Sequence, residues 1–226
     1  MREIRQMDVF ARLEADAWYQ RNRHGLSDLE EARKRDEVLK AFHELSIAPK
    51  RVLEVSCSNG WRLECLLREY GVECVGIEPS AEAIADAKAL FPEVRVVKGT
   101  AEELPFAEGE FDVVILGFFL YLCDREDLFK IACEVDRVLS DEGHLFVYDF
   151  FSPRPYRNIY KHKEGLFSYK MDYAKLFNWN PAYTTIHYTV FALPGFHEAN
   201  DPDSLLAVTV LRKCLKKAYP DNSSTP

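Results

Sequence analysis

The stretch RVLEVSCSNGW, residues Arg51 to Trp61, combines a short apolar run, a turn of small residues and the start of a helix. Turns of this kind usually hold several glycines, because the backbone has to come close to a ligand there. This turn keeps Gly60 and has Ser56 and Ser58 where glycines are expected. Taken alone, the stretch fits a nucleotide-binding loop and also fits a strand that happens to end in small residues.

The chain around this turn alternates between strand patterns and helix patterns from residue 51 to residue 150. This alternation is typical of right-handed crossover units that build a parallel sheet, and nearly continuous apolar strands indicate helices on both faces. Ligands of such sheets bind outside the carboxyl ends of the strands, beside the first strand. The expected strands are 51–55, 74–78, 94–99, 111–118 and 144–150, and the expected helices are 61–71, 79–92 and 124–143.

Three residues are expected to end or begin these helices. Gly71 is a good C-terminal cap, because glycine adopts the left-handed conformation without strain. Ser80 and Asp124 are expected to cap the next two helices through their side-chain oxygens.

The flanking segments complete an expected single domain over residues 1–218. Residues 1–48 are helical in pattern, and 151–182 form an irregular insert rich in aromatic residues. Two long strands are expected within 183–213, joined by the loop PGFHEANDPDS, and the tail 219–226 is expected to be disordered. The predicted fold is α/β: a doubly wound, Rossmann-like, seven-stranded and mostly parallel sheet with an antiparallel C-terminal hairpin and N-terminal helices.

Composition limits the classes of partner. With 226 residues, 47% hydrophobic and 29% charged, the chain has the composition of a globular domain. A net charge of −8 argues against nucleic acid, and the densest basic segment, PRPYRNIYKHK at 153–163, is interpreted as a solvated loop. The charged start and the lack of a long apolar run predict a cytoplasmic protein without a membrane span. Six scattered cysteines predict neither a metal site nor a disulfide framework.

The second predicted strand ends in Glu78, twenty positions after Ser58. An acid at this place in a dinucleotide-binding fold grips the ribose hydroxyls. The loop lacks the GxGxxG pattern of such folds, so the acid and the loop have to be interpreted together.

Four segments in order resemble the motifs of class I S-adenosylmethionine-dependent methyltransferases. VLEVSCSNG resembles the first motif, in which Glu54 is the acid and Ser56, Ser58 and Gly60 take the three glycine places. VGIEPSAEAI, VKGTAEELPFAEGEFDVVIL and the stretch from LGFFLYL to VYDF resemble the later ones. The resemblance implies S-adenosylmethionine as cofactor, with S-adenosylhomocysteine as product. The implied cofactor-binding residues of this core are Glu54, Ser56, Cys57, Ser58, Gly60, Glu78, Pro79, Thr100, Ala101, Glu102 and Gly117.

The resemblance extends to the flanks and has departures. Thr100 stands where the family often has Asp, and Ala101 and Glu102 would border the adenine. EADAWYQRN before the core and YKMDYAKLFNWNPAY after it resemble small methyltransferases of surface-polysaccharide and small-molecule clusters. In the wider family the N-terminal segment folds over the cofactor, which implies contacts of Tyr19, Arg21 and Asn22 with the methionine end. The alternative is that the aromatic residues of this segment only pack helices.

Methyl transfer from a sulfonium requires alignment of the nucleophile, and a hydroxyl acceptor also benefits from a general base. The candidates for the acceptor side are His162, Asp149 and Tyr121. His162 is equally compatible with an exposed loop, and Asp149 with a turn cap. The aromatic insert is compatible with a wall of a substrate pocket and with a dimer contact, so both a monomer and a homodimer are open.

The predicted function is methyl transfer to a small-molecule acceptor, at a hydroxyl oxygen of a sugar or secondary metabolite. The first alternative is a non-catalytic S-adenosylmethionine-binding protein, because serines replace two glycines of the loop. The second is a nicotinamide-dependent oxidoreductase or epimerase, which accounts for the sheet and Glu78 but not for the loop.

Overall fold

The computed structural model describes residues 5–26, 29–192 and 202–220. Among the helices of these residues, none has the length and apolar character needed to cross a membrane. The helices are α1 (Gln6–Val9), the π-helix η1 (Phe10–Glu14), α2 (Ala15–Asn22), η2 (Arg23–Leu26), α3 (Leu29–Arg35), α4 (Glu37–Glu44), α5 (Trp61–Tyr70), α6 (Ala81–Leu90), η3 (Leu120–Leu122), η4 (Arg125–Asp127), α7 (Leu128–Val138), α8 (Lys175–Asn178), η5 (Pro202–Ser204) and α9 (Leu215–Ala218). The strands are β1 (Arg51–Val55), β2 (Glu73–Glu78), β3 (Arg95–Lys98), β4 (Phe111–Gly117), β5 (Leu139–Phe150), β6 (Tyr156–Ile159), β7 (Phe167–Lys170), β8 (Tyr183–Ala192) and β9 (Leu205–Lys213).

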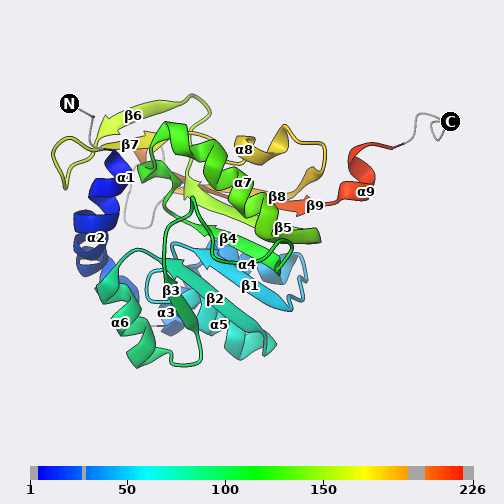
Figure 1. Ribbon diagram of the computed structural model, residues 1–226, viewed down its shortest axis with the longest axis horizontal. Coiled ribbons are helices and arrows are strands. Elements are labelled where there is room, and N and C mark those ends of the chain that lie inside the picture. Colours follow the sequence, from blue (N-terminus) through cyan, green and yellow to red (C-terminus); the bar gives the residue numbers. More distant parts are fainter. Residues whose placement is uncertain (1–4, 27–28, 193–201, 221–226) are drawn as a thin grey trace.

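Seven strands form one sheet in the order β3-β2-β1-β4-β5-β9-β8 (Figure 1). The strands from β3 to β5 are parallel, and β9 joins β5 in antiparallel orientation and pairs with β8. The order reverses at β1, so the carboxyl end of β1 is the switch point where such sheets bind ligands. The predicted fold class, including the antiparallel C-terminal hairpin, is confirmed.

Two hydrophobic cores lie on the two faces of this sheet, and the strand residues alternate between them. In β4, Val113 and Ile115 point to one core, while Val114 and Leu116 point to the other. Successive side chains of a strand lie on opposite faces, so a strand covered on both sides has to be apolar throughout. Helices α4 and α5 cover one face, and α7 covers the other (Figure 1).

The predicted helix caps hold at two of three positions. The side chain of Ser80 accepts a hydrogen bond from the Ala83 backbone, and Gly71 has a left-handed φ of 65°. Asp124 makes no side-chain cap. Its carboxylate instead accepts hydrogen bonds from the backbone N–H groups of Gln6 and Met7, so it holds the start of the N-terminal segment.

The structure differs from the sequence-based prediction in two regions. The helix before β5 ends at Val138, five residues earlier than expected. Leu139 already pairs with Phe111, and its carbonyl accepts a hydrogen bond from the buried amino group of Lys213. The insert 151–182 is more regular than expected, because it contains the antiparallel pair β6–β7 and the helix α8. Most of the expected hairpin loop and the tail beyond residue 220 lie outside the described residues.

The N-terminal segment α1–η1–α2 bridges two sides of the molecule across the carboxyl ends of the strands (Figure 1). At its start, the Gln6 side chain donates to the carbonyls of Leu122 and Phe167 at 2.6 and 2.8 Å. Further along, Asp16 accepts a hydrogen bond of 2.6 Å from the Ser80 hydroxyl at the start of α6. The segment is therefore attached to the insert on one side and to α6 on the other.

Gly76 in β2 allows the turn after β1 to lie against the sheet. A Cβ at this position would clash with the Cys57 sulfur and come within 3.1 Å of Leu63. We expect Gly76→Ala to lower the free energy of unfolding by about 1–3 kcal/mol, the range for overpacked cores. Chemical denaturation measures this cost. In a Cys57→Ala background the same substitution should cost clearly less, and an equal cost would contradict the packing argument.

Candidate functional site

The turn after β1 adopts the left-handed backbone conformation at each of its three motif positions. The φ angles are 61° at Ser56, 54° at Ser58 and 76° at Gly60. Glycine adopts this conformation freely, whereas other residues incur about 1–2 kcal/mol each. The two serines therefore occupy glycine-like positions in conformation as well as in sequence. Strain of this kind is retained where the backbone geometry serves a site.

The turn is fixed to the end of β2 by hydrogen bonds. The N–H of Ser56 donates to the Ile77 carbonyl at 2.8 Å, and the N–H of Ser58 donates to the Glu78 carboxylate at 2.8 Å. The other Glu78 oxygen accepts from the N–H of Ser80 at 2.9 Å. Burial raises the pKa of Glu78 to about 7, although both N–H donors favour its charged form. Each carboxylate oxygen keeps a further lone pair for a hydroxyl donor.

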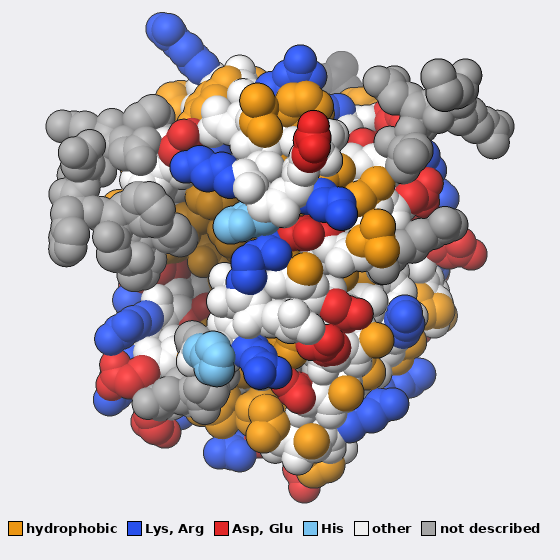
Figure 2. All heavy atoms as spheres, turned by 90° about the vertical axis from the view of Figure 1, so that its left-hand side faces the viewer, with side chains coloured by type: hydrophobic (Ala, Val, Ile, Leu, Met, Phe, Trp, Pro, Cys, Tyr) orange, Lys and Arg blue, Asp and Glu red, His pale blue; other side chains and the backbone are white. Residues whose placement is uncertain are grey.

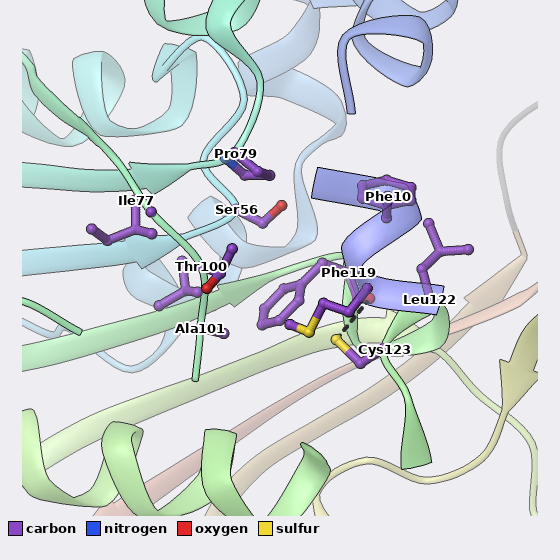
Figure 3. Close-up of a pocket in the computed structure, with 12 residues that line it drawn as sticks. Phe10, Ser56, Ile77, Pro79, Thr100, Ala101, Phe119, Leu122 and Cys123 are labelled. Atoms are coloured by element: carbon purple, nitrogen blue, oxygen red, sulfur yellow. Dashed lines mark hydrogen bonds between the residues drawn. The ribbon is translucent and has the colours of Figure 1, made fainter. Parts of the chain in front are cut away.

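An apolar cavity lies on one side of the turn (Figure 3). The ends of β1 and β2 and the segment after β3 form its base, and Phe10 of the N-terminal segment and Phe119 close it. Such a flat apolar space suits a purine ring. Its lining residues are Met7, Phe10, Val55, Ser56, Ile77, Pro79, Gly99, Thr100, Ala101, Phe119, Leu122 and Cys123.

A second cavity, of about 180 Å³, lies on the other side of the turn. It is more polar than the first, since three carboxylates and a guanidinium line it. Its lining residues are Phe10, Trp18, Asp36, Glu54, Ser56, Cys57, Ser58, Trp61, Arg62, Glu78, Gly117, Phe118, Phe119, Leu122 and Tyr148.

A buried chain of charges forms one wall of this second cavity. Arg62 forms an ion pair with Asp36 at 2.8 Å and another with Glu54. The side chains of Asp36 and Arg62 are each 7% exposed, and that of Glu54 is 1% exposed. The guanidinium also lies over the rings of Trp61 and Tyr148, at 4.9 and 5.7 Å from their centroids. Sequence analysis identified Glu54 but missed its two charged partners.

Two polar atoms at this cavity have no hydrogen-bond partner among the described residues. They are Glu54 Oε2 and Ser58 Oγ, and both are buried. Buried polar atoms are nearly always hydrogen-bonded, so an orphaned carboxylate oxygen indicates a place for a donor such as an ammonium group. Gly117 leaves room for this carboxylate, because a Cβ there would lie 2.7 Å from Glu54 Oε1. These residues fit the amino-acid end of S-adenosylmethionine.

A third cavity, of about 420 Å³, adjoins the second and shares Trp18 and Phe118 with it. Phe118 has a φ of 66°, a strained conformation for a bulky residue. Its ring packs against those of Tyr121 and Phe150 at 5.0 and 4.9 Å. The lining residues are Trp18, Arg21, Asn22, Phe118, Tyr121, Phe150, Asn158, Ile159, Tyr160, Lys161, His162, Ser168, Lys170 and Asp203.

The three candidates for the acceptor side lie in different surroundings. His162 and Tyr121 line the third cavity, and Tyr121 accepts a hydrogen bond of 3.1 Å from the Trp18 indole. Burial raises the pKa of Tyr121 well above its usual value of 10.0. Asp149 is 2% exposed and does not line this cavity. Its carboxylate accepts a hydrogen bond of 2.7 Å from the backbone N–H of Phe150.

The three predicted cofactor-binding residues of the N-terminal segment, Tyr19, Arg21 and Asn22, lie in two different places. Tyr19 is 2% exposed and donates to Asp86 on α6, so it packs the segment and lines none of the three cavities. Arg21 and Asn22 line the third cavity rather than the second. Arg21 pairs with the buried Glu14 and donates to the Tyr160 hydroxyl at 3.1 Å.

The remaining predicted residues gather at the turn. Glu54, Cys57, Ser58, Glu78 and Gly117 line the second cavity, and Gly60 caps α5 without lining a cavity. The first cavity is bordered by Pro79, Thr100 and Ala101, and Ser56 borders both. Glu102 is buried beside this region but lines neither cavity.

On the face of the molecule that carries the N-terminal helices, described basic and acidic side chains are interspersed among hydrophobic ones (Figure 2). The basic segment 153–163 contributes Lys161 and His162 to the third cavity.

The left-handed turn leads to a prediction for its serines. Ser58→Gly removes backbone strain and an unpaired hydroxyl, so we expect unfolding free energy to be unchanged or raised by about 1 kcal/mol, with cofactor binding retained. Ser56→Leu places a bulky chain between the two cavities and should abolish binding of S-adenosylmethionine while circular dichroism stays native. Normal binding by Ser56→Leu, measured by calorimetry, would contradict this assignment of the loop.

Asp149 leads to a prediction for the pH dependence of stability. Burial raises its pKa from 3.8 to about 7, so between these values the folded chain keeps a proton that the unfolded chain releases. Its contribution to stability is therefore lost as the pH rises toward and through 7. The side-chain amide of an Asp149→Asn variant cannot ionise, so the melting temperature of this variant should gain on the wild type between about pH 4.5 and about pH 8. A difference in melting temperature between the two proteins that stays constant with pH would refute the raised pKa of Asp149.

Comparison with known proteins agrees with this geometry. Residues 53–147 match a family described as a methyltransferase domain. An uncharacterized methyltransferase of Synechocystis is 35% identical over 50% of this chain and 55% of its own length. The demethylmenaquinone methyltransferase of Thermus thermophilus is 39% identical over 48% of this chain and 51% of its own.

A solved structure extends the likeness over nearly the whole fold. The 1,6-didemethyltoxoflavin-N1-methyltransferase of Burkholderia thailandensis, with S-adenosylhomocysteine bound, has a TM-score of 0.70 at 18% identity, and the match covers 92% of this chain and 89% of that one. The chain spans about half the length of the curated relatives it matches. Residues 53–147 are thus similar to a methyltransferase domain, and the solved structure shows the same fold over most of the chain.

Proposed function

We propose that this protein transfers a methyl group from S-adenosylmethionine to a small-molecule acceptor, at a hydroxyl oxygen of a sugar or secondary metabolite. The observation that carries the proposal is the meeting of the second and third cavities at Trp18 and Phe118. A cofactor cavity that shares lining residues with a larger cavity gives donor and acceptor a common boundary. Alignment at such a boundary is the main requirement of an in-line transfer.

The proposed cofactor site divides between the two cavities beside the turn. The apolar cavity takes the adenine, Glu78 takes the ribose hydroxyls, and Glu54 takes the ammonium group of the methionine part. When bound, S-adenosylmethionine supplies an electrophilic methyl group. Glu102 is proposed only as a buried neighbour of the adenine side, because its oxygens are buried and line neither cavity.

The proposed acceptor site is the third cavity. Its aromatic walls offer flat faces for a ring, and its polar groups offer hydrogen-bond partners for hydroxyls. His162 is the proposed base, because it lines the cavity and histidine is the side chain that most often acts as a general base. Tyr121 is proposed to position the acceptor through its hydroxyl, at the boundary with the cofactor cavity. Asp149 supports the backbone of Phe150 from behind this wall.

Binding measurements distinguish the proposal from its alternatives. We expect calorimetry to detect S-adenosylmethionine and S-adenosylhomocysteine at submillimolar concentrations, and we expect no thermal shift with NAD. Failure of both adenosyl ligands to bind would refute the proposal. Binding without methylation of any compound in a broad hydroxyl-acceptor panel would favour the non-catalytic alternative.

His162 provides a test of the acceptor side. His162→Gln should lower kcat at least about 100-fold, the usual minimum contribution of a general base, while the Kd of S-adenosylhomocysteine stays the same. His43→Gln is the matched control, because His43 lies on α4 beside Glu69 and lines none of the three cavities. Equal activities of the two variants would remove His162 from the mechanism.

A further inference from the structure

The buried charges Asp36, Arg62 and Glu54 come from three different elements. Asp36 is the N-cap residue of α4, Arg62 lies in the first turn of α5, and Glu54 lies in β1. All three line the second cavity. Arg62 thus connects the start of α4 to the motif acid Glu54.

The arginine is held in one orientation by both carboxylates. Its Nε lies 3.2 Å from each oxygen of Asp36, and its Nη2 donates to Asp36 Oδ2 at 2.8 Å. Nη1 donates to Oε1 of Glu54. A planar guanidinium that is engaged on two edges fixes both partners in direction, which a flexible ammonium group cannot do.

The same contacts decide which oxygen of Glu54 remains for a ligand. Oε1 is engaged by Arg62, and Oε2 is buried without a hydrogen-bond partner among the described residues. Gly117 leaves the space that Oε1 occupies, because a Cβ at this position would lie 2.7 Å from that oxygen. Leaving a buried carboxylate oxygen unpaired is costly, so its retention favours a ligand donor at that point.

The net charge of Asp36, Arg62 and Glu54 also favours the binding of a cation. Two carboxylates and one guanidinium sum to a net charge of −1 in a space where the side chains are at most 7% exposed. A single ammonium group would bring the total to zero. Burial otherwise acts against the charge on Glu54 and raises the pKa of this carboxyl to about 7.

We propose that Asp36 and Arg62 are positioning residues that aim Oε2 of Glu54 at the ammonium group of the cofactor, so that the contact between the start of α4 and α5 controls affinity for its amino-acid part. This inference rests on the proposed function, because it assigns the second cavity to that part of S-adenosylmethionine. It differs from a purely structural role in one respect. Asp36 and Arg62 should affect the Kd of ligands that carry the amino-acid group and leave unchanged the Kd of ligands that lack it.

The test compares S-adenosylhomocysteine with 5′-methylthioadenosine, which has the adenosine and the sulfur but no amino-acid group. We expect Asp36→Asn and Arg62→Lys to raise the Kd of S-adenosylhomocysteine about 10-fold or more, the effect of losing a charge-assisted contact. The Kd of 5′-methylthioadenosine should change less than about twofold. Asn is a suitable replacement at position 36, because it still caps α4.

Two further variants make the comparison independent of folding defects. Glu54→Gln keeps the size of the side chain and should show the same selective loss, with melting temperature measured alongside. Arg68→Lys is the control, because Arg68 pairs with Glu64 on the same helix and lines none of the three cavities.

The outcomes distinguish failure of the positioning role from failure of the proposed function. Selective loss for S-adenosylhomocysteine supports the positioning role, whereas equal losses for both ligands, or no loss, overturn it. An Asp36→Asn or Arg62→Lys variant that fails to fold while folded Glu54→Gln binds both ligands normally also overturns it. If the wild type binds neither ligand, it is the proposed function that fails.

Discussion

The left-handed backbone of the turn between β1 and α5 is the constraint on which the rest of this site depends. Three positive φ angles within five residues bend the chain away from the sheet and point successive N–H groups toward β2. Ser58 thereby reaches the Glu78 carboxylate, which fixes the ribose-side acid relative to the turn. Gly60 then starts α5, and Arg62 enters the site from the first turn of that helix.

Serine at two of the three positions changes the energetics of the turn without changing its path. Each serine accepts a strained conformation that glycine would adopt freely, and the strain is opposed by hydrogen bonds to Ile77 and Glu78. The hydroxyl of Ser58 adds a buried polar atom without a partner among the described residues. The turn is therefore stabilised by what surrounds it, and the close fit of Cys57 over Gly76 belongs to that support.

The sequence predicted the sheet well because its signals are local. A strand such as β9 (Leu205–Lys213) is apolar up to Leu211 except at Thr209, and Ser80 precedes a helix with the expected spacing. The hairpin β6–β7 escaped prediction, because its four-residue strands are too short to show a period. The burial of Arg62 and Asp36 was not predicted from the sequence for a different reason. Charged residues near helix starts are ordinarily exposed, and only the pairing across 26 positions, visible in three dimensions, allows their burial.

The N-terminal segment α1–η1–α2 borders both the proposed cofactor site and the proposed acceptor site. Phe10 borders the two cofactor cavities, and Trp18, two turns later, borders the cofactor and acceptor cavities. The segment is attached to the insert on one side and to α6 on the other, so contacts at both ends set its position over the cavities. Phe118 lines both the second and the third cavity with a left-handed backbone, and strain of this kind is retained where the backbone geometry serves a site.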